Sequence, residues 1–140
     1  MLRRLCLIGL IVIGIGASAD EKENMSNVMS EATAEHYKWG GNNDGWHYLK
    51  RDDLSIIKER MVPGGQEKPH FHEKARQFFF VIEGVLTMKT PERDYELVSG
   101  SGLEIAPGLI HQAVNATDKD VVFTVTSFPP SHGDRVNVED

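Results

Sequence analysis

The chain has 140 residues, with 21 acidic and 15 basic side chains and a formal net charge of −6. An acidic chain of this length fits one compact domain, and its charge argues against nucleic acid or an anionic membrane surface as a partner. The single cysteine, Cys6, lies close to the N-terminus, so the rest of the chain has no disulfide, cysteine nucleophile or zinc–thiolate site.

The first residues have the pattern of a secretory signal peptide. Arg3 and Arg4 precede an apolar run, which is followed by the small-x-small cleavage sequence Ala17-Ser18-Ala19. The apolar run is about a dozen residues long. A membrane-spanning helix needs ~20. The pattern therefore predicts a cleavable leader.

We expect cleavage to remove residues 1–19 and to leave a secreted or periplasmic protein that begins at Asp20. Loss of the two leader arginines changes the net charge from −6 to −8. The mature protein is then expected to have no membrane contact. Translation from Met25 or Met29 would instead give a cytoplasmic protein.

Two regions follow the leader. Residues 20–35 are polar and without periodicity, which predicts a flexible extension with at most a short helix around 30–34. The folded domain is predicted over residues 36–140. It starts with aromatic residues between glycines, and we expect Trp39 and Trp46 to cover a sheet edge or to pack at a subunit interface.

Short strand-like runs separated by turn signals make up the rest of the domain. The predicted strands are 54–61, 68–72, 77–82, 85–89, 95–98, 103–106, 110–114 and 121–126. Regularly spaced short strands without an amphipathic helix indicate an all-β sandwich or barrel, with its core over residues 54–128. The tail after this core is predicted to be irregular.

The strand at 77–82 is apolar on two faces. Side chains on a strand alternate, which separates Gln77, Phe79 and Val81 from Phe78, Phe80 and Ile82. We expect this strand to be buried on both sides, between the domain interior and a second sheet or subunit.

Three histidines have the spacing of a metal site. His70 and His72 are one residue apart on a predicted strand, so their side chains lie on the same face. His111 follows the turn sequence Ala106-Pro107-Gly108 and begins another β-prone stretch. Three neutral nitrogen donors suit a divalent transition metal such as iron(II), nickel, zinc or manganese.

The other chemistry-bearing residues have simpler interpretations. His36 and His47 are expected to pack among aromatic residues, and His132 to face solvent in a Pro/Gly-rich tail. Arg76 and Arg135 either clamp an anionic substrate or lie solvated at the surface.

Over residues 54–128 the sequence resembles the cupins. The first cupin motif is matched in register by Gly64, His70, His72 and Gly84. The second is matched, with one residue fewer around the Pro-Gly, by Gly102, Pro107-Gly108, His111 and Asn115. The resemblance implies a small double-sheet jelly-roll barrel, one divalent metal inside its mouth, and often a homodimer.

Gln77 occupies the position at which cupins usually have a metal-binding glutamate. A glutamine carbonyl oxygen can ligate a metal but brings no charge and cannot act as a general base. The resemblance therefore implies a metal held by His70, His72 and His111, with Gln77 on the metal or beside it.

Two functions agree with this ligand set. The first is an iron(II)-dependent, dioxygenase-like enzyme that acts on a small organic substrate. The alternative is a non-catalytic module that binds a small molecule or a carbohydrate. The sequence names neither the catalytic residues nor the substrate.

Overall fold

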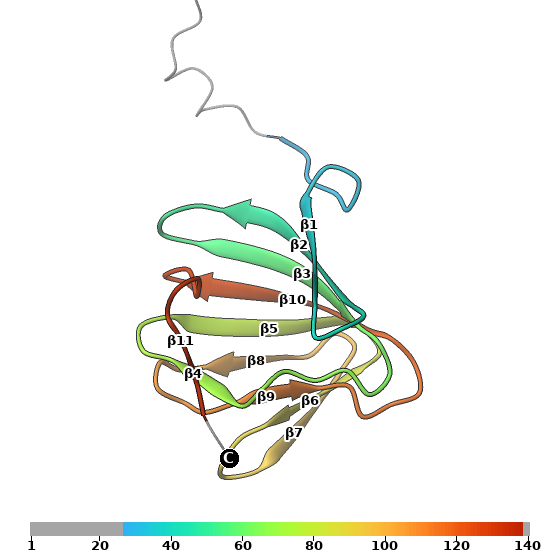
Figure 1. Cartoon of the computed structure of the whole chain (residues 1–140). Coiled ribbons are helices and arrows are strands. Elements are labelled where there is room, and N and C mark those ends of the chain that lie inside the picture. The colour runs from blue at the N-terminus through green and yellow to red at the C-terminus, as the bar shows by residue number, and fades with distance from the viewer. Residues whose placement is uncertain (1–26, 139–140) are drawn as a thin grey trace, which may run out of the picture.

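The computed structural model describes residues 27–138, which form a sandwich of two antiparallel sheets (Figure 1). The strands are β1 (Glu35–Trp39), β2 (Asn43–Lys50), β3 (Ser55–Met61), β4 (His70–His72), β5 (Arg76–Glu83), β6 (Val85–Lys89), β7 (Asp94–Val98), β8 (Gly102–Ile105), β9 (Gln112–Val114), β10 (Val121–Phe128) and β11 (Arg135–Asn137). Within these residues there is no helix, and so none that could cross a membrane. The predicted leader, and the first part of the predicted extension, lie outside the described residues.

The strand order is that of a double-sheet jelly roll. The larger sheet has the order β1-β2-β3-β10-β5-β8. The second consists of β7-β6-β9 and the pair β4-β11, which are joined by a bridge between His70 and His111. Sequence-distant strands therefore lie side by side, and the all-β jelly-roll prediction is confirmed.

The core lies between the two sheets. In β10 the inward residues Val121, Phe123 and Val125 are buried, while Val122 and Thr124 between them are partly exposed. Burial of each large apolar side chain contributes roughly 1.5–3 kcal/mol. The inward residues of β3, β5, β6 and β10 together form one cluster, which fills the sandwich.

The side chains of strand β5 alternate between its two faces, as the sequence predicts. Gln77, Phe79 and Val81 are buried, with exposures of 5, 2 and 0%. The expectation that a second sheet buries the other face is wrong, because the second sheet packs only on the inner face. Phe78, Phe80 and Ile82 are 46, 39 and 46% exposed on the single chain.

The large sheet begins well before residue 54. Strands β1 and β2 form a hairpin that pairs with β3 and includes Trp39 and Trp46, which therefore lie within strands rather than over a sheet edge. Residues 30–34 form a turn, with the amides of Thr33 and Ala34 donating to the Ser30 carbonyl. The tail leaves the large sheet as predicted, but β11 then pairs with β4.

Candidate metal centre

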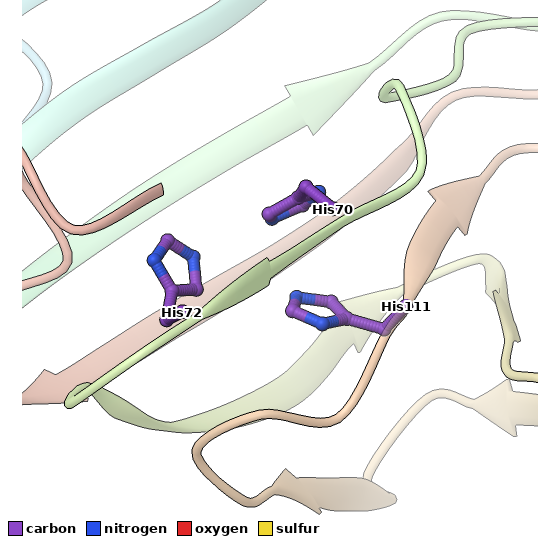
Figure 2. Close-up of side chains that lie close together, drawn as sticks. All are labelled: His70, His72 and His111. Carbon is purple, nitrogen blue, oxygen red and sulfur yellow. The ribbon is translucent and has the colours of Figure 1, made fainter. Parts of the chain in front are cut away.

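His70 and His72 lie on β4, and both point into the space between the sheets (Figure 2). The strand has only three residues, and Phe71 between the histidines is more exposed than either. Alternation along an extended strand is therefore sufficient to place both imidazoles on the inner face. The structure confirms the same-face placement that the spacing predicts.

His111 reaches the same place by a turn. Gly108 has a φ of +81°, and the Leu109 amide donates to the Ala106 carbonyl at 3.2 Å, which closes a tight turn after Pro107. The Gly108 amide also donates to the His72 carbonyl at 2.7 Å. His111 then exchanges two backbone hydrogen bonds with His70, of 2.8 and 3.1 Å. The turn thus fixes the third histidine beside the first.

The three imidazoles are buried and close together. His70, His72 and His111 are 1, 5 and 1% exposed, and one nitrogen from each lies within 4.8 Å of the others. Burial lowers the pKa of His70 and of His111 to about 4, and it also lowers the pKa of His72. The rings are therefore neutral near pH 7, which is the form that binds a metal.

Backbone carbonyls orient two of the rings. His70 Nδ1–H donates to the Lys68 carbonyl and His111 Nδ1–H to the Leu109 carbonyl, each at 2.9 Å. Because a neutral imidazole has one N–H, the Nε2 lone pair of both rings is available to a ligand. His72 Nδ1 is buried and has no hydrogen-bond partner in the described part of the chain.

Gln77 projects from β5 toward the same group. Its Oε1 lies 3.1 Å from His111 Nε2, and its Nε2 donates to the Ser127 hydroxyl at 3.3 Å. With the ring proton of His111 on Nδ1, both atoms of the 3.1 Å pair are acceptors. Two lone pairs therefore face each other at this point.

A cavity of about 570 Å³ opens beside the histidines. Phe79, Ile57 and Val125 give it an apolar wall. Its polar lining is Glu35, Tyr37, His47, Lys50, Glu59, Glu67, His70, His72, Gln77, Ser131, His132 and Arg135. Trp39 also lines it, and Trp39 Nε1 and His47 Nδ1 are further buried ring nitrogens without a partner among residues 27–138.

Glu59 is a cavity residue that the sequence interpretation missed. It lies on the inner face of β3 and is 9% exposed. Tyr37 O–H donates to its Oε1 at 2.9 Å. Burial raises the pKa of Glu59 to about 8. The available signal was the alternation of β3, because Glu59 is in phase with Ile57 and Met61 on the buried face.

The remaining candidates are distributed as follows. His36 binds Asp44 at 2.8 Å on the outside of the hairpin, and His132 is exposed as expected but lies at the cavity. Arg135 lines the cavity, with Nη1 3.6 Å from Glu67 Oε1. Arg76 instead pairs with Glu104, away from the cavity.

The fold and the site together define a jelly-roll protein with a buried three-histidine cluster beside a cavity. The sequence model of the cupin domain matches residues 57–127. The chain therefore belongs to the cupin family. No curated protein matches it.

Solved structures show the same fold. A polyketide cyclase, RemF from Streptomyces resistomycificus, superposes with a TM-score of 0.71 at 20% identity, over 83% of this chain and 87% of that one. An uncharacterized protein with a double-stranded β-helix domain from Klebsiella pneumoniae superposes with a TM-score of 0.69 at 19% identity. The match covers 83% of this chain and 100% of that one. A cupin-superfamily sugar phosphate isomerase from Silicibacter pomeroyi superposes with a TM-score of 0.63 at 20% identity. The match covers 74% of this chain and 76% of that one.

Proposed function

We propose that the protein binds one divalent transition metal through His70, His72 and His111 and uses it to convert a small organic molecule held in the adjoining cavity. The observation that carries this proposal is the convergence of three buried, neutral imidazoles within 4.8 Å. Buried polar atoms normally have partners, and His72 Nδ1 has none among the described residues. A cation bound by the cluster would supply Lewis acidity at the cavity.

Gln77 is proposed as the fourth ligand. Two atoms each about 2.1 Å from one ion, at right angles, lie about 3 Å apart. The 3.1 Å between His111 Nε2 and Gln77 Oε1 has this value, and a cation shared by the two lone pairs would remove their mutual repulsion.

Metal content tests the assignment directly. Purified protein should contain about one transition metal per chain, and the His70→Ala/His72→Ala double variant should lose it. His132→Ala serves as the matched control, since that exposed histidine is outside the cluster. Retention of the metal by the double variant would overturn the proposal.

Gln77→Glu tests the fourth position. A carboxylate adds one negative charge next to the cation, so the variant should bind the metal at least tenfold more tightly in a chelator competition. Glu83→Gln, on an exposed side chain of the same strand, should leave the affinity unchanged. Equal affinity of the wild-type protein and Gln77→Glu would place Gln77 beside the metal rather than on it.

An iron(II)-dependent oxidation is one form of this function. Three histidines on one side of an ion leave positions open for substrate and dioxygen, and carboxylate-poor sites do not exclude iron. Anaerobic loading with iron(II), followed by oxygen uptake with catechols, β-diketones and thiols, tests it. Uptake that requires both iron and one substrate class would support the oxygenase.

The non-catalytic alternative is a cavity that retains a carbohydrate or another polyol without converting it. The unpartnered nitrogens of Trp39 and His47 favour a polar occupant. Calorimetry with metal-loaded protein would then show binding, while the same ligand stays chemically unchanged over hours.

We further propose that two copies pair through the outer face of the large sheet. Phe78, Phe80 and Ile82 form an apolar strip there, which is exposed on the single chain. A second copy that covers this strip would bury the face that the alternating sequence of β5 makes apolar.

A further inference from the structure

The wall of the cavity contributed by the large sheet contains a row of three aligned residues. Tyr37 on β1 is the register partner of Gly45 on β2, and Gly45 is the partner of Glu59 on β3. A Cβ at Gly45 would lie 2.2 Å from Tyr37 Cζ, so the tyrosine ring occupies the space over the glycine. Tyr37 thereby reaches across one strand to donate to Glu59.

Glu59 lies in surroundings that favour a neutral acid. Its partner on β10, Phe123, is fully buried. The charged groups that act on it are Glu67, which raises its pKa, and Arg135, which lowers it. Arg135 pairs with Glu67, and no ion pair to Glu59 occurs among residues 27–138. Desolvation is the largest effect, and the pKa of Glu59 rises to about 8.

The acid and the histidines share one cavity. Glu59 lines it from the large sheet, while His70 and His72 line it from β4 of the other sheet. Glu67 also lines this cavity, and it interacts electrostatically with Glu59 and with His111. The Glu59 carboxyl group and these two histidines therefore line the same cavity.

We propose that Glu59 is the acid–base residue of this cavity, held by Tyr37, and that it moves a proton on a small carbonyl compound with a C–H bond next to the carbonyl. This inference rests on the proposed metal-dependent function, because the carbonyl oxygen must face the histidine site. Gln77 cannot supply a carboxylate at the histidine site, whereas Glu59 brings a carboxyl group to the cavity from the same large sheet.

The proton transfer balances without an oxidant or a co-reactant. The ionised Glu59 carboxylate takes the proton from the carbon, the C–H electron pair forms a C=C bond, and the carbonyl π pair moves to oxygen. A divalent cation held by His70, His72 and His111 would supply the positive charge that favours the enolate oxygen. The reverse step returns the proton from Glu59 to the same or to a neighbouring carbon. A group with a pKa near 8 both accepts and returns protons near neutral pH.

The first test measures the protonation state of the Glu59 carboxyl group in metal-free protein. Infrared difference spectra between wild type and Glu59→Gln should show a protonated carboxyl C=O band at pH 6 that disappears with a midpoint near pH 8. Tyr37→Phe removes a hydrogen bond that stabilises the carboxylate, so it should move this midpoint to higher pH. A carboxylate that is already ionised at pH 6 would refute the proposal.

The second test measures exchange at carbon. Zinc-loaded protein in D₂O should exchange the C–H protons of dihydroxyacetone or pyruvate, followed by proton NMR under anaerobic conditions. Glu59→Gln should lower the exchange rate at least 100-fold, in the range expected for loss of a general base. Tyr37→Phe should shift the pH profile upward, as in the infrared test. Glu83→Gln is the control.

The outcomes separate this inference from the proposed function. Wild-type exchange rates in Glu59→Gln, or no exchange of either compound by the fully zinc-loaded wild type, would refute the role of Glu59 and leave the metal assignment intact. Failure to bind zinc, measured by metal content, would refute the proposed function.

Discussion

Replacement of Glu59 by glutamine should make the protein more stable, by an amount that grows with pH. The amide oxygen of the introduced glutamine can still accept from Tyr37 O–H, so the packing of the wall is preserved. The variant removes only the ionisation of a carboxyl group that is 9% exposed.

The direction of this stability change follows from the pKa of Glu59 in the unfolded chain and in the folded protein. Burial raises the pKa of Glu59 from 4.5 to about 8, so the folded protein holds a proton that the unfolded chain loses between these values. The contribution of this group to stability is complete below pH 4.5 and declines as the pH rises toward 8. The slope is about 1.4 kcal/mol per pH unit, which amounts to about 2–3 kcal/mol between pH 5 and pH 7.

The assay is urea unfolding of metal-free wild type and Glu59→Gln at several pH values. The pKa values of His70 and His111 are lowered by burial, and these rings favour folding as the pH rises from about 4 to 6.5. Both histidines contribute equally to the stability of the wild type and of the variant, so their contribution cancels when the two free energies of unfolding are subtracted. The stability gained by the variant should therefore rise steadily to pH 8 and then level off. A difference that stays flat from pH 5 to pH 8 would refute the reasoning.

Three further predictions concern the rest of the molecule. Phe123→Ala should lower the free energy of unfolding by about 3–5 kcal/mol, because it empties a fully buried site, and an unchanged urea midpoint would contradict that packing. Light scattering should give the mass of a dimer at micromolar concentration, and Phe80→Lys on the exposed strip should give a monomer that still folds; a monomeric wild type would end the pairing proposal. We also propose secretion, for which N-terminal sequencing of native protein should find Asp20; a start at Met25 would place the protein in the cytoplasm.

The three-histidine cluster was largely predictable because its determinants are local. The His70/His72 spacing works through strand alternation alone, and Pro107-Gly108 specifies a tight turn before His111. The strands of the core were predictable for the same reason, since each has its own run of β-prone residues between turn signals. The hairpin β1–β2 was missed because its glycines and aromatic residues resemble loop composition, although positive φ at Gly40 and Gly41 makes that composition a turn.

The all-β class, the placement of two histidines on one strand and the alternating faces of β5 therefore follow from local residue patterns. Which of those two faces is covered, and which acid lines the cavity, depends on how the strands pack together. Glu59 is 22 residues from Tyr37, and their contact depends on three strands in register with a glycine in the middle. Strand register between segments is set by packing of the whole sandwich, because an inward side chain contacts the opposite sheet as well as its own neighbours. Local residue patterns do not contain that information.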